Sequence, residues 1–247
     1  MRGPHSGELL AAIITPDRLC SVSKRMHFYL EDKQMKFWTL ILVGLVSVPS
    51  AWLSAQDAVV DKTPKDAAEL TTEGKVEGVT PKADADDLPQ EIKDLLKPLH
   101  EANEASSQVF ESLTAEQLNF RPADGSHTAR WNAEHLGGSQ LLFISEVYHS
   151  LDPRIPVFKV TPKQMPKDYT PRHAEWSGSQ EADWLRRVDR FTHHYAGLLK
   201  DVDLDSKPPA GPFPTYRAML KGLAKHYQQH TANVEKKFND PQWPGKK

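Results

Sequence analysis

The segment Thr215–Phe238 reads TYRAMLKGLAKHYQQHTANVEKKF, and its pattern decides the fold class. Apolar residues recur every three or four positions, which is typical of an amphipathic helix. His226 and His230 are four residues apart and lie on or beside the apolar stripe. Residues at this spacing share one face of a helix, so the two imidazoles can converge on one metal ion. The segment therefore predicts both a core helix and part of a metal site.

The same period appears in three other segments, which gives an all-α prediction. Helices are expected over about 88–113, 129–150 and 180–200, and no segment alternates in the manner of a half-buried strand. Four amphipathic helices of this length are typical of a four-helix bundle. We expect that bundle to occupy residues 88–240.

The connection between the second and third predicted helices is unusually long. It runs from Asp152 to Gly178 and contains five prolines. Long connections inside compact domains are usually functional or cross from one end of the domain to the other. This proline-rich connection could span the bundle and form a wall of a substrate site.

The N-terminal region carries a targeting pattern. Residues 37–56 contain no charge, Lys33 and Lys36 precede them, and small residues follow up to Ala55. A positive start, an apolar centre and a small residue at the cut are typical of a signal peptide. We expect translation to start at Met35, residues 1–34 to be a mis-assigned upstream extension, and residues 35–55 to be cleaved near Ala55.

Cleavage predicts a secreted or periplasmic protein with no stable membrane span. The alternative is a protein anchored in the membrane through residues 37–55, because the uncharged run is close to spanning length. Residues 56–87 have no aromatic side chain and an excess of acidic residues, so we expect a disordered acidic linker there.

Composition excludes several other classes of protein. The 247 residues carry a net charge of −2, which leaves no electrostatic footprint for nucleic acid. Cys20 is the only cysteine, so the chain cannot form an internal disulfide. The chain also has no Gly-x-Ser-x-Gly elbow and no phosphate-binding loop. Tyr227 stands where a His-Glu-x-x-His metalloprotease needs its glutamate, which argues against that class.

A third histidine belongs with the pair. His135 follows Trp131 by four residues and precedes Leu142 by seven, so it faces inward from the second predicted helix. A buried imidazole without a partner costs about 1–3 kcal/mol. One such residue is more often a satisfied core histidine, but three on two facing helices favour a shared metal ion. The histidines at other helix positions are interpreted as solvated or locally hydrogen-bonded: His100, His149, His193 and His194.

Two tracts give the chain a family resemblance. They are LTAEQLNFRPADGSHTARWNAEHL (residues 113–136) and HYQQHTANV (residues 226–234), in this order around a long connection. Over residues 88–239 the chain resembles the DinB-like superfamily of four-helix proteins. The resemblance implies that the family's three metal-ligating histidines correspond to His135, His226 and His230.

The resemblance also implies a range of activities. Characterised relatives include metal-dependent hydrolases and transferases and isomerases that use a low-molecular-weight thiol, and many members have no assigned reaction. The family name derives from DNA-damage induction and implies no DNA binding. Low-molecular-weight thiols are mainly cytosolic, so the predicted export argues against the thiol S-transferase.

Three neutral imidazoles leave at least one coordination position of a metal ion open. Such an ion can lower the pKa of bound water to about 7 or hold a thiol as thiolate. Imidazole suits zinc, nickel, copper and iron, with zinc and nickel as the first choices here. We expect Asn233, seven residues after His226, to support a ligand, and Glu134 to point along a different face. The alternative is a non-catalytic exported metal-binding or interaction module, and either form is compatible with a homodimer.

Overall fold

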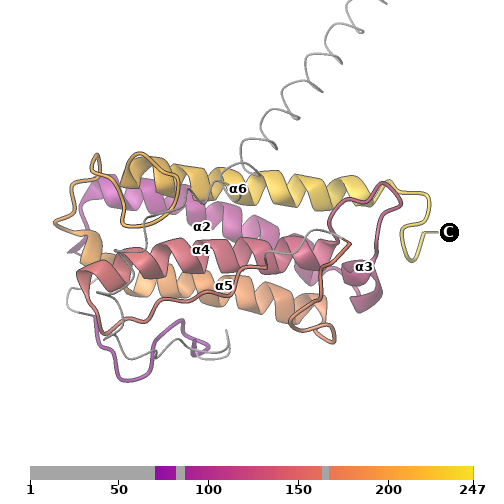
Figure 1. Cartoon of the computed structure of the whole chain (residues 1–247), viewed down its shortest axis with the longest axis horizontal. Helices are drawn as coiled ribbons and strands as arrows, with labels where there is room; N and C mark the ends of the chain where they lie inside the picture. The colour runs from indigo at the N-terminus through magenta and orange to yellow at the C-terminus, as the bar shows by residue number, and fades with distance from the viewer. Residues whose placement is uncertain (1–69, 82–86, 163–166, 247) are drawn as a thin grey trace, which may run out of the picture. The chain divides into compact units, whose positions relative to one another are not determined.

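The computed structural model describes residues 70–81, 87–162 and 167–246. Over these residues the chain is all-α and contains no strand, which confirms the predicted class. The elements in order are α2 (Gln90–Glu111), α3 (Ala115–Asn119), α4 (Ala129–Leu151), α5 (Gly178–His194), the 3-10 helix η4 (Ala196–Leu199) and α6 (Tyr216–Lys237) (Figure 1). The upstream extension and the signal peptide predicted from the sequence lie outside the described residues.

Side-chain caps fix where most of the helices begin. The hydroxyl group of each N-cap residue accepts a hydrogen bond from the backbone N–H three residues later, which satisfies a donor that the helix itself cannot pair. The pairs are Thr114 with Gln117, Thr128 with Trp131, Ser177 with Gln180 and Thr215 with Ala218. Local sequence therefore sets the start of α4, the helix that carries His135.

Cross-helix contacts give the direction of each long helix. Asn103 and Ser106 of α2 contact Tyr227 and Thr231 of α6, in the same order along both helices. These two helices are therefore parallel.

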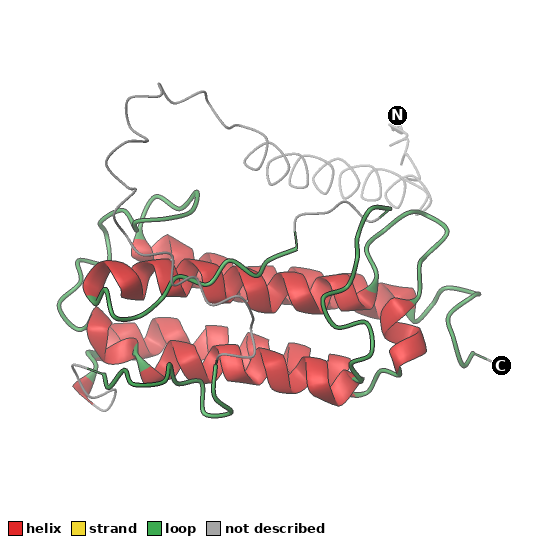
Figure 2. Ribbon diagram, turned by 60° about the horizontal axis from the view of Figure 1, so that its bottom comes forward, coloured by secondary structure: helices red, strands yellow, loops and turns green. Residues whose placement is uncertain are grey.

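α4 and α5 are parallel as well. Arg130, near the start of α4, contacts Glu181 near the start of α5, and Tyr148, near the end of α4, contacts Thr192. The chain must therefore return along the whole length of α4 before α5 begins. A helix of 23 residues is about 34 Å long, so the connection has to span about that distance. This return explains the long connection 152–177, whose described residues run along the helices (Figure 2).

A pair of glycines lets other segments approach α4 closely. A Cβ atom at Gly137 would lie 2.5 Å from Nε1 of Trp184 in α5, and one at Gly138 would lie 2.7 Å from Cα of Thr161 in the connection. Neither distance is tolerated by real side chains. The two glycines directly after the His135 turn thus allow α5 and the connection to pack on α4.

Residues 70–81 are packed, although the sequence predicted a disordered linker there. The backbone N–H of Val76 donates to the hydroxyl of Tyr195 at 3.0 Å, and that hydroxyl donates to the carbonyl of Val79 at 3.1 Å. Leu70 is buried in the core. Gly74 has a φ of 71° and contacts the backbone of Phe191, where a side chain would not fit. The segment is held by these backbone hydrogen bonds and by Leu70, Val76 and Val79, which pack on the core.

None of the helices in the described part of the chain combines the length and the apolar character that crossing a bilayer requires. The segment 37–55, which the sequence offered as an alternative anchor, lies outside that part.

A fully buried arginine holds the start of α4. Arg130 Nε donates to Oδ1 of Asn119 at 2.7 Å, Nη1 donates to the carbonyl of His173 at 2.8 Å and to Oε1 of Glu181, and Nη2 donates to the carbonyl of Trp176 at 2.7 Å. Both side chains of the Arg130–Glu181 ion pair are 0% exposed. One guanidinium therefore joins α3, α4, the connection and α5.

We expect Arg130→Met to lower the free energy of unfolding by about 3–5 kcal/mol, because it leaves the Glu181 carboxylate buried without its partner. Urea denaturation followed by circular dichroism measures the change. The double variant Arg130→Met/Glu181→Leu should regain part of the loss, since no charge is then left unpaired. A loss below about 1 kcal/mol in the single variant would contradict this role for Arg130.

Candidate metal centre

The three histidines singled out in the sequence meet in space. His135 comes from α4, and His226 and His230 come from successive turns of α6. One ring nitrogen from each lies within 4.8 Å of the others, a grouping that could hold a metal ion. Nε2 of His135 is 3.2 Å from Nε2 of His226. Packing of α6 against α4 therefore brings together residues 91 or more positions apart in the chain.

The spacing of the donor atoms fits a metal ion. Two nitrogens bound to one tetrahedral ion at about 2.0–2.1 Å lie about 3.3 Å apart. The separation of 3.2 Å between the facing Nε2 atoms is close to that value. Among the described residues, no other His, Cys, Asp or Glu belongs to this group.

Asn132 orients His230. Oδ1 of Asn132 accepts a hydrogen bond from Nδ1 of His230 at 2.7 Å, and Nδ2 of Asn132 donates to the carbonyl of Thr128 at 2.7 Å. The second bond fixes which way the amide points. With its proton on Nδ1, His230 presents the lone pair of Nε2, and such partners commonly tune a metal ligand. Asn233, which the sequence predicted for this role, is exposed on α6.

Stacked rings hold His135 in place. Trp131 stacks on His135 with ring centroids 4.4 Å apart, and His127 stacks on Trp131 with centroids 3.6 Å apart. Nδ1 of His135 is buried and has no hydrogen-bond partner within the protein. The ring is therefore positioned by packing along α4 and by its contact with His226.

Burial keeps all three imidazoles neutral. Loss of water lowers the pKa of His226 to about 4. Loss of water also lowers the pKa values of His135 and His230 well below their ordinary value, and the neighbouring histidines add to the effect. Neutral imidazole is the form that binds metal, so at neutral pH the site needs to release few protons before binding.

The neighbours of the ligands in sequence point elsewhere. The buried hydroxyl of Tyr227 accepts a hydrogen bond from Nδ2 of Asn103 at 3.0 Å, on the side of α6 that faces α2. Oε1 of Glu134 accepts a hydrogen bond from the backbone N–H of Arg172 at 2.9 Å. Glu134 therefore points along a different face from His135, as expected.

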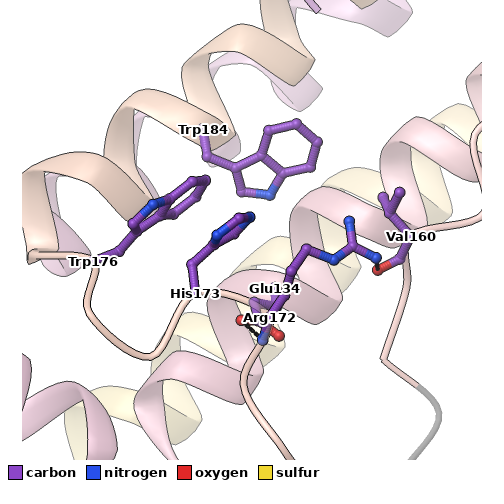
Figure 3. A pocket seen from close by; sticks show the side chains of 6 residues that line it. All are labelled: Glu134, Val160, Arg172, His173, Trp176 and Trp184. Carbon is purple, nitrogen blue, oxygen red and sulfur yellow. Dashed lines mark hydrogen bonds between the residues drawn. The ribbon is translucent and has the colours of Figure 1, made fainter. Parts of the chain in front are cut away.

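Glu134 faces a pocket that lies between α4, α5 and the long connection (Figure 3). The lining residues are Glu134, Val160, Arg172, His173, Trp176 and Trp184. His173 stacks flat on Trp176 with centroids 3.8 Å apart. The connection thus forms one wall of this pocket, and none of the three candidate ligands lines it.

Three of the remaining histidines have clear outcomes. Nδ1 of His149 bonds the carbonyl of Ile155 at 2.7 Å, which is a local hydrogen bond as expected. His100 and His193 are partly exposed as expected, and they meet across α2 and α5 with Asp189 between them. Asp189 and His193 are four residues apart, the same spacing as in α6, but their partner on another helix is visible only in the fold.

A family model of the DinB superfamily matches residues 98–234, which is more than half of the chain. The chain belongs to the DinB superfamily. The matched range contains His135, His226 and His230, so the histidines found by helical spacing fall within the family domain. No curated protein and no solved structure matches the chain.

In this DinB superfamily protein, we expect Asn132→Ala to weaken zinc binding by about 10–100-fold, because His230 loses the partner that orients it. Competition with a chromophoric chelator gives the dissociation constant. Asn233→Ala is the matched control, since Asn233 is exposed on the helix that carries two of the ligands, and its affinity should equal that of the wild type. Equal zinc affinities for the wild type, Asn132→Ala and Asn233→Ala would show that Asn132 does not support metal binding.

Acidification should destabilise the metal-free protein. The unfolded chain takes up a proton on His226 near pH 6.5, whereas the folded chain does so only near pH 4, so stability is present above pH 6.5 and is lost between these values. The loss from this residue is on the order of 3 kcal/mol, at about 1.4 kcal/mol for each pKa unit. His226→Leu should flatten the dependence of unfolding free energy on pH, measured by urea denaturation in EDTA. An unchanged slope would contradict the burial effect.

Proposed function

We propose that the protein is a metal-dependent enzyme that acts on a small-molecule substrate. The observation that carries the proposal is the convergence of three neutral imidazoles with no fourth protein ligand among the described residues. Closed structural sites normally use four protein ligands, whereas catalytic sites keep one position open. Membership of the DinB superfamily supports the same assignment.

The residues of the chain have separate roles in this proposal. His135, His226 and His230 hold the ion. Asn132 fixes the tautomer of His230, and Trp131 fixes the orientation of the His135 ring by stacking on it. When bound, a divalent ion supplies Lewis acidity at neutral pH. The donor set fits zinc or nickel, which we propose as the resident metals.

Hydrolysis is the first candidate reaction, and transfer to a low-molecular-weight thiol is the second. The order follows from the proposed export: a signal peptide at 35–55 would deliver the protein to the periplasm or the medium, where such thiols are scarce. Retention through residues 37–55 would anchor the same domain to the membrane. We propose a four-helix bundle over 88–240 with the proline-rich connection as its crossover, and a homodimer is compatible with it.

One observation favours a non-catalytic alternative. The pocket beside Glu134 contains none of the three histidines, and His226 is only 8% exposed. An ion that lies outside this pocket and is held by a buried His226 would suit an exported metal-binding or interaction module. Access of a substrate to the ion distinguishes the two functions.

Metal analysis followed by an activity screen tests the proposal. The full chain should bind zinc or nickel, and His226→Ala/His230→Ala should bind one equivalent fewer and lose activity against esters, phosphoesters or thiol acceptors. His149→Ala is the control, because its imidazole bonds only the nearby Ile155 carbonyl. Equal metal content in the wild type and the double variant would refute the site. If the double variant binds one equivalent less metal but the wild type has no activity in the screen, the result would favour the binding module.

A further inference from the structure

A second group of side chains that could hold a metal ion shares no residue with the tris-histidine centre. His100 comes from α2, and Asp189 and His193 come from successive turns of α5. One donor atom from each lies within 4.8 Å of the others, and none of these residues belongs to the first centre. Two imidazoles and a carboxylate are a common donor set for transition metals.

The contacts within this group leave two buried donor atoms unused. Nδ1 of His100 bonds Oδ2 of Asp189 at 2.7 Å. The other carboxylate oxygen, Oδ1, is 3.7 Å from Nε2 of His193, which is too long for a hydrogen bond. Both atoms are buried and have no hydrogen-bond partner, and Asp189 as a residue is only 5% exposed.

A metal ion would satisfy both atoms at once. An ion bound at about 2.0–2.1 Å to each of two atoms can lie between them when they are up to about 4.1 Å apart. The 3.7 Å gap between Asp189 Oδ1 and His193 Nε2 meets this condition. An unpaired buried polar atom costs about 1–3 kcal/mol, so filling the gap favours the folded state.

The ion can enter from solvent. The side chains of His100 and His193 are 55% and 41% exposed, whereas that of Asp189 is 8% exposed. The two rings meet edge to face with centroids 5.4 Å apart. The two rings are therefore partly exposed, whereas the free atoms Asp189 Oδ1 and His193 Nε2 lie buried beneath them.

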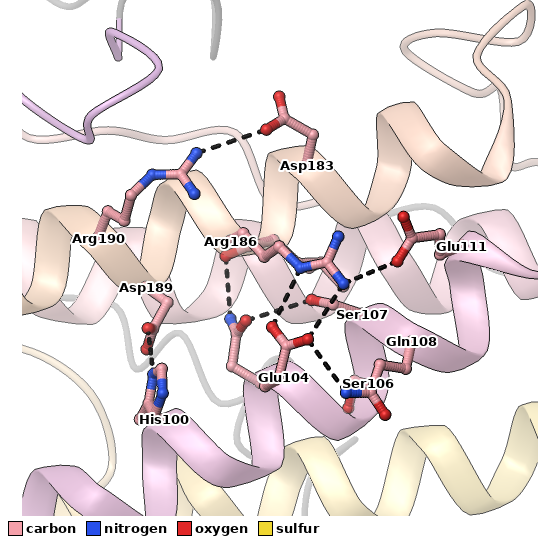
Figure 4. A network of polar contacts seen from close by, with 12 residues as sticks. His100, Glu104, Ser106, Ser107, Gln108, Glu111, Asp183, Arg186, Asp189 and Arg190 are labelled. Carbon is pink, nitrogen blue, oxygen red and sulfur yellow. Dashed lines mark hydrogen bonds and ion pairs between the residues drawn. The ribbon is translucent and has the colours of Figure 1, made fainter.

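The arginines next to Asp189 on α5 form ion pairs with other acidic residues. Arg186 is held by Glu104 at 3.0 Å and by Glu111 at 2.8 Å, and Arg190 points toward Asp183 at 3.4 Å (Figure 4). The arginines of α5 are thus paired with other acids. The figure shows His100 joined to Asp189.

We propose that His100, Asp189 and His193 form a second site for a divalent transition-metal ion, of the zinc class, that joins α2 to α5. The carboxylate offsets one of the two charges of the ion, so this site is less cationic than the tris-histidine centre. It does not depend on the proposed enzyme activity. A bound ion stabilises the fold in proportion to its concentration over its dissociation constant.

The test uses zinc alone on the full chain with the first centre removed by His226→Ala/His230→Ala. Calorimetric titration should show one zinc equivalent bound, and zinc should raise the melting temperature. Adding His193→Ala, or separately His100→Ala, should weaken binding at least tenfold. Adding His194→Ala should leave binding unchanged, because this partly exposed neighbour is outside the group.

Absence of zinc binding in the double variant at 100-fold excess would overturn the proposal. Retained binding after both His100→Ala and His193→Ala would also overturn it, since the ion would then lie elsewhere. If His193→Ala fails to fold, as judged by circular dichroism, His100→Ala decides the question, because His100 is the most exposed member of the group.

Discussion

The positive charge of Arg130 cannot be removed by deprotonation, and its side chain is fully buried, so its surroundings must supply hydrogen-bond acceptors. These acceptors come from α3, from the connection and from α5. The first turn of α4 is therefore fixed relative to three other segments. Trp131, Asn132 and His135 follow within the next turn and a half, so the geometry of the metal centre depends on this guanidinium.

The parallel direction of α4 and α5 accounts for the rest of the architecture. It requires the chain to travel back along α4, and the returning connection contacts α4 at Glu134 and at Gly138. One face of α4 then carries His135 toward α6, and another carries Glu134 toward the connection. Gly137 and Gly138 make room for the covering segments directly after these two residues. Adjacent residues of one helix thus serve two separate sites.

Helical periodicity was sufficient to find the helices and the three histidines, because both depend on spacing within one segment. Features that depend on pairing between segments were out of reach. Asn132 and Asn233 both suit the task of holding a ligand, but only the register between α4 and α6 selects Asn132. The group around Asp189 needs His100 from another helix. Residues 70–81 pack through backbone hydrogen bonds to Tyr195, which the side-chain composition does not show.

The two ends of the domain have different surroundings. Residues 70–81 join it beside Tyr195, at the far end of α5 from Glu181. The tail after α6 instead folds back beside α3, where Gln117 bonds the carbonyl of Pro244 and Trp243 packs on Phe120. That tail leaves α6 two turns after His230, at the same end as the imidazoles. A polyhistidine purification tag attached at the C-terminus would therefore place competing ligands at the end of α6 that carries His230.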